Sequence, residues 1–377
     1  MRILYISEDY SASKVHHELV SRIVGLGHHV TVFTVVRLAD SKNDISTTYK
    51  TVNYRLCTYN LSKWAEFPYR YLFSFKRKLK YSKLIKQVNP REIDLTHAAT
   101  LFSEGIIAYE LFKKYSIPYT VAVRGTDIEL YLSKMPHLWE LGAKILSNSS
   151  KIIFISPNIQ RKFENKKPVK SIISSIKDKC VIIPNGIEDY WINNRVRKRS
   201  QFPPQNILYI GRFDENKNVE RLVKSVIELR ETIGNVHLDM VGGGDICHST
   251  ILRYCEKYPD TLTYLGKIYD KQKLLDVMRA NQIFAMVSHS ETFGLVYLEA
   301  LSQGLPILYT AGQGIDGTVP ENVGEKAKSK NQSDITYKLK RIIENYPNYQ
   351  LLGDNLLNFS WDTIASKYSN IFKQIYN

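Results

Sequence analysis

Short apolar runs alternate with amphipathic stretches from the first residues of the chain onward. The runs at 2–7, 29–33 and 119–123 are typical of strands that are buried on both faces of a parallel sheet. Between the first two runs, residues 14–25 carry apolar side chains at helical spacing. A strand, a helix and a second strand in this order predict a βαβ unit with a right-handed crossover. Ligands of such sheets bind at the carboxyl ends of the strands, so the loops that follow strands are the places to search for a site.

The same alternation restarts in the second half of the chain. Residues 207–210 form an apolar run, and a helical pattern follows from about 219 to 232. With 377 residues, the chain is too long for one ordinary hydrophobic core and suits two domains. The sequence therefore predicts two α/β domains.

One stretch of the second half combines a helix start with two carboxylates. The apolar run 283–287 has the pattern of a buried strand, polar residues follow it, and a helical pattern starts at Gly294. Glu291 lies in the loop before this helix and Glu299 lies inside it. The N–H groups near Gly294 and Leu295, together with the helix dipole, favour an anion. A phosphate at the helix start with a carboxylate on either side suits a nucleotide-sugar, although glutamates at this spacing also occur in ordinary solvated helices.

Two cations follow the first strand of the second half. Arg212 comes soon after the apolar run, and Lys217 stands at the entrance of the next helix. Two cations near a helix N-terminus make a diphosphate site on electrostatic grounds. The alternative is a surface arginine and lysine that flank a turn. A further strand, 239–244, ends in glycines, where a backbone can approach a ligand closely.

Polar residues also end two predicted strands of the first half. Residues 94–97 have the pattern of a strand that ends at His97, and Arg124 and Asp127 follow the strand at 119–123. These positions place the three side chains at the edge where ligands bind. An ordinary turn with an aspartate cap would contain the same residues after a strand.

Charge is distributed unevenly between the two halves. The formal net charge is +15; residues 1–190 hold 29 Lys/Arg against 17 Asp/Glu, and residues 191–377 hold 23 against 20. The first half, with a net charge of +12, is therefore expected to face nucleic acid or an acidic membrane surface. Its basic residues form no recognised motif for reading nucleic acid, which disfavours that partner. Four scattered cysteines without a Cys-x-x-Cys pair predict reduced thiols in the cytoplasm.

Residues 64–87 combine clustered aromatics with basic residues that alternate with apolar ones. This pattern suits an interfacial helix whose cations bind anionic lipid and whose rings sit among the headgroups. Since no run of about 18 apolar residues occurs, we expect peripheral contact with the inner face of a membrane and no spanning helix. The alternative is a surface helix that packs its aromatics into its own domain. The residues expected to face the membrane are Trp64, Arg70, Lys76, Arg77, Lys78 and Lys80.

Six pieces of the second half resemble, in order, motifs of the retaining glycosyltransferases of family 4, the group 1 family with the GT-B fold. The pieces are Pro184-Asn-Gly-Ile187, Gly211-Arg212 with Lys217, Met240 to Gly244, Tyr264-Leu-Gly266, Ser290 to Leu295 with Glu299-Ala300, and Gly304-Leu-Pro306. Phe359-Ser-Trp361 resembles the C-terminal signature of the family, and the first half matches in outline only. The resemblance implies two Rossmann-like parallel-sheet domains that face a cleft. The implied divisions are an acceptor-binding domain at 1–190, a linker at 191–204, a nucleotide-sugar-binding domain at 205–358, and a C-terminal helix at 359–377 that crosses back to the first domain.

The resemblance also implies roles for the residues singled out above. Arg212 and Lys217 would hold the diphosphate, Glu291 would contact the donor sugar, and Glu299 would bind the ribose. The two cations would replace a metal ion, so neither a metal nor another cofactor is expected. The further expected donor contacts are Gly243, Gly266, Thr292, Phe293, Gly294 and Leu295, and the further expected catalytic residues are Arg124, Asp127 and His97.

Two departures from the family concern the acceptor side. The first loop, residues 8–13, lacks the glycine pair that many members carry. Arg124 stands where many members have a histidine, and an arginine cannot be deprotonated and so cannot serve as a proton carrier at neutral pH. His97 is the nearest titratable candidate for such a role.

The expected function is transfer of a sugar from a UDP- or GDP-sugar to a hydroxyl of a glycan or lipid-linked acceptor, with retention of anomeric configuration. We expect this transfer to serve the synthesis of a cell-surface polysaccharide or glycoconjugate. Two alternatives stay open, namely a nucleotide-sugar epimerase on the same fold and a non-catalytic binding subunit of a glycosyltransferase complex. The combination of two phosphate cations with two glutamates favours transfer over both.

Overall fold

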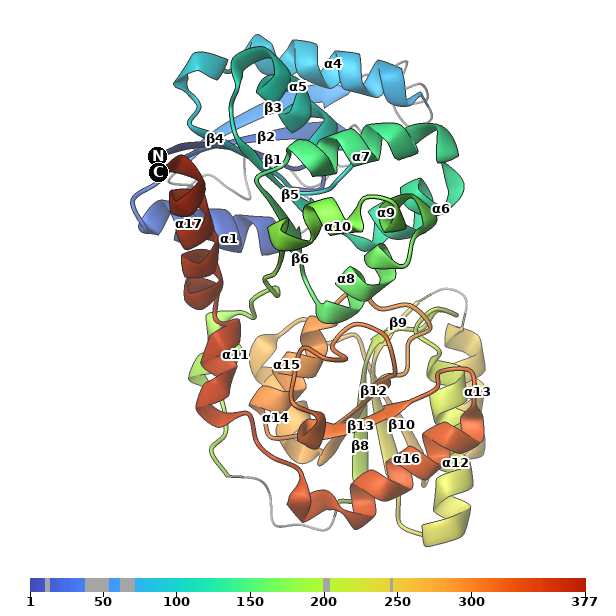
Figure 1. Ribbon diagram of the computed structural model, residues 1–377. Helices are drawn as coiled ribbons and strands as arrows, with labels where there is room; N and C mark the ends of the chain where they lie inside the picture. The colour runs from blue at the N-terminus through green and yellow to red at the C-terminus, as the bar shows by residue number, and fades with distance from the viewer. Residues whose placement is uncertain (11–13, 38–53, 62–71, 199–203, 245–246) are drawn as a thin grey trace. The chain divides into compact units, whose positions relative to one another are not determined.

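The computed structural model describes residues 1–10, 14–37, 54–61, 72–198, 204–244 and 247–377 (Figure 1). These residues divide into two compact units. No described helix combines the length and the hydrophobicity that crossing a bilayer requires. The first unit comprises Met1–Ile155, Ile159–Asn185 and Trp361–Asn377, and the second comprises Ser156–Asn158 and Gly186–Ser360.

The first unit is built on a seven-stranded sheet in which every neighbouring pair of strands is parallel. The strand order is β3-β2-β1-β4-β5-β6-β7. Strands β4 and β5 are buried along their whole length, as expected of strands that are covered on both faces. The bounds are β1 (Arg2–Ile6), β2 (His29–Arg37), β3 (Arg55–Leu61), β4 (Leu95–Ala98), β5 (Tyr119–Val123), β6 (Lys151–Phe154) and β7 (Cys180–Ile182).

Helices pack on this sheet, and one of them comes from the far end of the sequence. Helix α17 lies beside α1 (Figure 1), and its apolar residues Trp361, Tyr368 and Phe372 join Leu19 and Val32 in one buried cluster. The last helix of the chain therefore completes the core of the first unit. The helix bounds are α1 (Lys14–Gly25), α4 (Phe73–Ile85), α5 (Gly105–Tyr115), α6 (Leu132–Lys134), α7 (Trp139–Asn148), α8 (Pro157–Glu164), α9 (Lys167–Lys170), α10 (Ile173–Ile176) and α17 (Trp361–Tyr376).

The second unit repeats the plan with a six-stranded sheet, again parallel throughout, in the order β10-β9-β8-β11-β12-β13. Its strands are β8 (Asn206–Arg212), β9 (His237–Gly243), β10 (Leu262–Gly266), β11 (Ile283–Ala285), β12 (Ile307–Thr310) and β13 (Gly324–Ala327). Its helices are α11 (Asp189–Asn193), α12 (Val219–Ile233), α13 (His248–Lys257), α14 (Lys271–Ala280), α15 (Leu295–Ser302) and α16 (Gln332–Glu344). The parallel sheets predicted for both halves are thereby confirmed.

The strand order reverses direction once in each sheet. In the first unit the chain passes from β1 outward to β3 and then returns to β4 on the other side of β1. In the second unit it passes from β8 outward to β10 and then returns to β11 on the other side of β8. Loops that leave such a switch point diverge and open a crevice at the carboxyl ends of the strands. The fold therefore directs attention to the loops after β1 and β4, and to those after β8 and β11.

Candidate functional site

An ion pair joins the loops after β8 and β11. Nζ of Lys217 lies 2.6 Å from Oε2 of Glu291, and only 18% and 14% of the two side chains are exposed. The other carboxylate oxygen of Glu291 accepts a hydrogen bond from the backbone N–H of Thr292 at 3.1 Å. The structure thus brings together one predicted phosphate cation and one predicted sugar-binding carboxylate at a switch point of the sheet.

Two asparagines on either side of Lys217 fix its position. Nδ2 of Asn216 donates to the carbonyl of Ser290 at 3.0 Å, and its Oδ1 accepts from the N–H of Ser290 at 2.9 Å. Nδ2 of Asn218 donates to the carbonyl of Val287 at 3.1 Å. These bonds fasten the loop after β8 to the loop after β11 and place Lys217 opposite Glu291. Neither asparagine was singled out from the sequence. They could have been found as amide side chains, which both donate and accept hydrogen bonds, on each side of a loop cation.

Two glycines allow the backbone to approach Glu291 closely. Gly294 has φ +81° and Gly314 has φ +47°, a region that favours glycine. A Cβ on Gly314 would lie 2.7 Å from Cγ of Glu291, and a Cβ on Gly294 would lie 2.6 Å from the ring of Tyr297. Gly294 is also the N-cap residue of α15, whose first N–H groups have no partner within the helix. The start of α15 therefore offers an anion-binding edge beside the carboxylate.

Arg212 ends β8, and 76% of its side chain is exposed. Its Nη2 lies 3.2 Å from Oδ2 of Asp214, and Oδ1 of the same carboxylate accepts from the N–H of Lys217 at 2.8 Å. Asp214, which sequence reasoning did not single out, therefore links the two predicted phosphate cations. The strand ends meet closely at this point, because a Cβ on Gly242 would collide with the carbonyl oxygen of Gly211.

The other predicted donor contacts differ in their exposure. Gly243 and Gly266 end β9 and β10, on the same edge of the sheet as Arg212. Thr292 is exposed and Leu295 is half-buried. Phe293 is buried, with 3% of its surface exposed, so only its main chain can reach a ligand.

Glu299 lies in the second turn of α15. Burial and the nearby Glu188 raise the pKa of its carboxyl to about 7, although Lys271 opposes them. Lys271 is itself ion-paired with Glu188. At neutral pH the Glu299 carboxyl therefore exists in both protonation states and can donate or accept a hydrogen bond.

His97 is a core residue of the first unit. It lies in β4 and is fully buried, with the rings of Tyr5 and Tyr368 at centroid distances of 5.0 and 5.5 Å. Its Nδ1 lies 2.8 Å from Oγ1 of Thr120. Burial, and then the guanidinium of Arg124, lower the pKa of His97 to about 3, so the ring stays neutral. The side chain of His97 thus packs in the core of the first unit, and its catalytic role stays a prediction.

Asp127 ties two loops together at the carboxyl edge of the same sheet. It is buried and accepts hydrogen bonds from the backbone N–H groups of Leu101, Phe102 and Arg124 at 2.9–3.1 Å. Burial raises the pKa of Asp127 to about 6, although these three N–H groups lower it. Both oxygens thus accept from the backbone, which gives Asp127 a structural role, and its catalytic role stays a prediction. Arg124 is half-buried, and its Nε donates to the carbonyl of Ala99 at 3.3 Å.

Two of the lysines that were predicted to face a membrane point into the first unit. Lys80 is 1% exposed, is ion-paired with Glu8, and donates to the carbonyl of Ser103 at 2.7 Å. Nζ of Lys76 lies 2.9 Å from Oε2 of Glu8, and 13% of its side chain is exposed. The N–H of Glu8 in turn donates to Oε1 of Glu104 at 2.9 Å. The prediction of lipid contact is therefore wrong for Lys80 and Lys76, since their charges are neutralised inside the protein.

The remaining members of that set differ from one another. Lys78 is exposed and Arg77 is half-buried on the same helix, α4. Phe75 of α4 is 36% exposed. Trp64 and Arg70 lie outside the described residues. The outer face of α4 therefore keeps part of the predicted basic and aromatic character.

Comparison with known proteins shows the family of the chain. The profile of "Glycosyltransferase Family 4" matches residues 12–190, and that of "Glycosyl transferases group 1" matches residues 193–356. The chain belongs to the group 1 glycosyltransferases. The family that the motifs of the second half indicated is thereby confirmed.

Relatives of this glycosyltransferase include the putative teichuronic acid biosynthesis glycosyltransferase TuaC of Bacillus subtilis, which is 22% identical over 98% of this chain and 95% of TuaC. Another is α-monoglucosyldiacylglycerol synthase of Acholeplasma laidlawii, 23% identical over 87% of this chain and 82% of that enzyme.

Solved structures of the same fold include the lipopolysaccharide outer core galactosyltransferase WaaB (TM-score 0.73, 17% identity, 99% of each chain). Anabaena HepE in complex with UDP-glucose has a TM-score of 0.68 at 15% identity, over 99% of this chain and 100% of HepE. These likenesses confirm the GT-B fold with two Rossmann-like units.

Proposed function

We propose that this glycosyltransferase moves a sugar from a UDP- or GDP-sugar to a hydroxyl group of a glycan or lipid-linked acceptor. We further propose that it retains the anomeric configuration, requires no metal ion, and serves the synthesis of a cell-surface polysaccharide or glycoconjugate. The names of two similar proteins support the donor and the product class. HepE was solved with UDP-glucose, and TuaC is named for teichuronic acid biosynthesis.

The observation that carries the proposal is the pairing of Lys217 with Glu291 at the start of α15, beside Arg212. A diphosphate-sugar combines negative charge at one end with hydroxyl groups at the other. Two cations and the N–H groups of a helix start suit the diphosphate. A carboxylate whose position is fixed by an ion pair and by a backbone N–H suits the hydroxyl groups, because its remaining lone pairs accept hydrogen bonds.

The proposed roles of the site residues follow from where negative charge develops during sugar transfer. In the proposed reaction the bond between the anomeric carbon and the phosphate oxygen breaks, and negative charge grows on the departing diphosphate. Arg212, Lys217 and the start of α15 stabilise that charge and so perform the task that a metal ion could otherwise perform. The departing phosphate oxygen takes the proton of the acceptor hydroxyl, whose oxygen bonds to the anomeric carbon on the same face. Configuration is therefore retained, and no side chain needs to act as base.

For the acceptor side we propose peripheral contact with an anionic membrane at the inner face, through the exposed part of α4. Lys78 supplies an exposed cation, and Phe75 and Leu72 supply apolar surface, with Leu72 56% exposed. Such a face suits interfacial binding. The name of the similar α-monoglucosyldiacylglycerol synthase, which denotes a glycolipid product, supports a lipid-linked acceptor.

The decisive experiment incubates the purified protein with UDP- and GDP-sugars, with and without a lipid extract as acceptor, in the presence and absence of EDTA. We expect nucleoside diphosphate release only with acceptor, undiminished by EDTA, and an anomeric proton coupling in the product that matches the donor. Epimerised nucleotide-sugar without acceptor would overturn transfer in favour of epimerisation. An inverted coupling constant would overturn retention, and full loss of activity with EDTA would overturn metal independence.

A further inference from the structure

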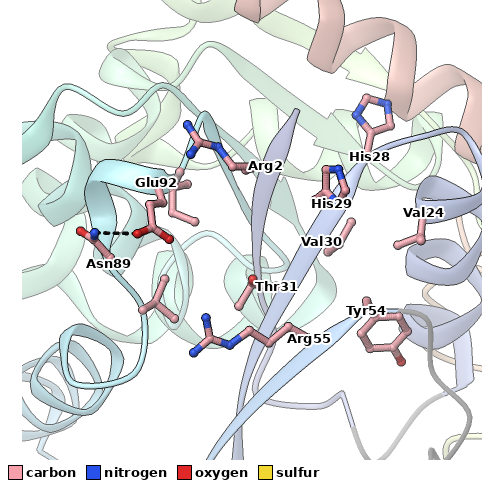
Figure 2. A pocket seen from close by; sticks show the side chains of 12 residues that line it. Arg2, Val24, His28, His29, Val30, Thr31, Tyr54, Arg55, Asn89 and Glu92 are labelled. Atoms are coloured by element: carbon pink, nitrogen blue, oxygen red, sulfur yellow. Dashed lines mark hydrogen bonds between the residues drawn. The ribbon is translucent and has the colours of Figure 1, made fainter.

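A pocket lies at the opposite edge of the first unit's sheet, where β1, β2 and β3 begin (Figure 2). Its volume is about 640 Å³, which lies within the range of small-molecule sites. The loops of the switch point lie at the carboxyl ends of the strands, whereas this pocket opens at their amino ends. The residues proposed to bind the donor belong to the second unit. The pocket is therefore built from other residues than the site described above.

Strand pairing gathers polar side chains in this pocket. Arg2 pairs with His29, and Thr31 pairs with Arg55. Paired residues of parallel strands lie on the same face, as do residues two apart in one strand. The four residues therefore form a polar row across three strands, and all four line the pocket. Further along the same face of β2 the chain returns to buried Phe33, so the polar row is confined to the strand starts.

Two arginines and one carboxylate are among the described residues that line the pocket. Arg2 is held by Asp94, which accepts from its Nη2 at 2.9 Å and from its backbone N–H at 2.7 Å. Arg55 donates from Nη2 to the carbonyl of Gln87 at 2.8 Å, and no carboxylate among the described residues is paired with it. Glu92 is the one carboxylate among the described residues that line the pocket, and it accepts from Asn89 at 2.9 Å (Figure 2). Within the described part of the chain, the guanidinium of Arg55 therefore has no ion-pair partner and can meet an anionic group of a ligand.

The other part of the wall is apolar. Val88 and Ile93 line it, and so do Val24, Val30 and Tyr54, which belong to the apolar cluster on the face of the sheet opposite the polar row. A wall of this kind excludes water from the body of a ligand, while the polar row fixes its charged end. The pocket therefore suits a small molecule that carries an anionic group on a compact organic body.

We propose that this pocket binds a small organic phosphate, with the phosphate on Arg55 and the organic body against the apolar wall. A guanidinium presents parallel N–H groups that match two phosphate oxygens, which a point charge does not. Arg2, which Asp94 orients and neutralises, adds N–H donors at the same strand starts. This inference goes beyond the proposed glycosyl transfer and does not depend on it.

The test measures binding of glycerol 3-phosphate, glucose 6-phosphate and inorganic phosphate to the full chain by isothermal titration calorimetry, with glycerol as an uncharged control. We expect at least one of the two phosphate esters to bind, more tightly than inorganic phosphate does, and glycerol not to bind. Arg55→Ala should weaken this binding at least ten-fold, and Thr31→Val, which removes one polar group and keeps the shape, should weaken it by a smaller factor.

Two control variants make the result specific to this pocket. Arg91→Ala removes an exposed arginine of the neighbouring turn that does not line the pocket, and it should leave binding unchanged. Arg212→Ala should also leave binding unchanged, because that residue lies in the second unit. Failure of both esters to bind, equal loss with Arg91→Ala, loss with Arg212→Ala, or wild-type affinity in both pocket variants would each overturn the proposal. Circular dichroism and thermal unfolding of each variant establish that it is folded.

Discussion

Nζ of Lys217 lies 2.6 Å from Oε2 of Glu291, although 74 positions separate the two residues in the chain. Lys217 follows β8, Glu291 follows β11, and these strands are neighbours in the sheet. The return of the chain from β10 to β11 thus places a cation from one loop on a carboxylate from another. The site depends on this topology as much as on the two side chains.

Glu291→Gln should lower turnover by about 100-fold, the usual size of a lost electrostatic contact in a transition state. The amide keeps the shape of the side chain but removes the charge that pairs with Lys217 and one acceptor oxygen for sugar hydroxyls. The measurement is turnover with whichever UDP- or GDP-sugar the wild type uses best. Glu321→Gln is the matched control, because Glu321 is 85% exposed and paired with Lys326 on the surface. Wild-type turnover in Glu291→Gln would contradict the site.

Arg212→Ala should weaken binding of the nucleoside diphosphate by about 10-fold, which corresponds to one charge-assisted hydrogen bond of about 1.4 kcal/mol. Stability should change little, because 76% of the side chain is exposed and its one described ion pair, with Asp214, lies at the surface. Titration of UDP and GDP by calorimetry checks both the affinity and the choice of base. Arg253→Ala, which changes another exposed arginine of the same unit, should bind the nucleotides as the wild type does.

Much of the fold could be predicted from the sequence because most buried strands are short apolar runs and the helices at 14–25 and 219–233 have helical apolar spacing; β3 and β13, which are not apolar runs, were not predicted. The helix expected to start at Gly294 is observed as Leu295–Ser302, with Gly294 as its N-cap residue. The expected helix at 219–232 is observed as Val219–Ile233. Local patterns sufficed for these two helices because tertiary packing buries the same apolar positions that the helical spacing indicates.

The candidate site could be predicted only in part, because sequence shows which strand end a residue follows but not what it meets there. Lys217 and Glu291 were expected in one crevice, and they form an ion pair. Lys80 was expected on a surface, yet its partner Glu8 lies 72 positions earlier in the chain. Asp127 likewise meets backbone N–H groups that follow a different strand. Partners supplied by distant segments decide whether a charged side chain serves a ligand or the fold.

Protonation of Glu299 should make stability depend on pH. Its pKa is raised to about 7 in the folded protein, whereas the ordinary value is 4.5. Between these values the folded state keeps a proton that the unfolded state has released, so the contribution of Glu299 to stability falls as pH rises from 4.5 to 7. Glu299→Gln should therefore reduce the decline in the free energy of unfolding over this window, by up to about 2 kcal/mol. Urea unfolding at pH 5 and pH 7.5 provides the comparison, and an unchanged decline would contradict the assignment.

Lys80 and Lys78 lie two residues apart on α4, but substitution of Lys80 should lower the stability of the protein much more than substitution of Lys78. Lys80→Ala removes a buried cation that pairs with Glu8, so we expect a loss of about 3 kcal/mol in the free energy of unfolding. Lys78→Ala, at an exposed position, should change it by less than about 0.5 kcal/mol.

The charge on Glu8 should also make the pH dependence of the free energy of unfolding differ between the two lysine variants. Burial raises the pKa of Glu8, but Lys80 and Lys76 outweigh burial and hold it at about 2. This contribution to stability is therefore complete above the ordinary value of 4.5 and is lost as the pH falls toward 2. Lys80→Ala should reduce that acid-dependent loss, and Lys78→Ala should leave it unchanged.

In vesicle binding, Lys78→Ala should have the larger effect and Lys80→Ala the smaller one, the reverse of their effects on stability. If the exposed face of α4 contacts anionic lipid, Lys78→Ala should weaken binding about five-fold, which corresponds to about 1 kcal/mol for one surface lysine. Folded Lys80→Ala should bind as the wild type does, since the buried ammonium cannot reach a headgroup. Flotation with anionic vesicles, and with neutral vesicles as the reference, measures both variants. Equal recovery of the wild type with the two kinds of vesicle would remove the membrane contact, and a selective loss with Lys80→Ala would contradict the burial of its charge.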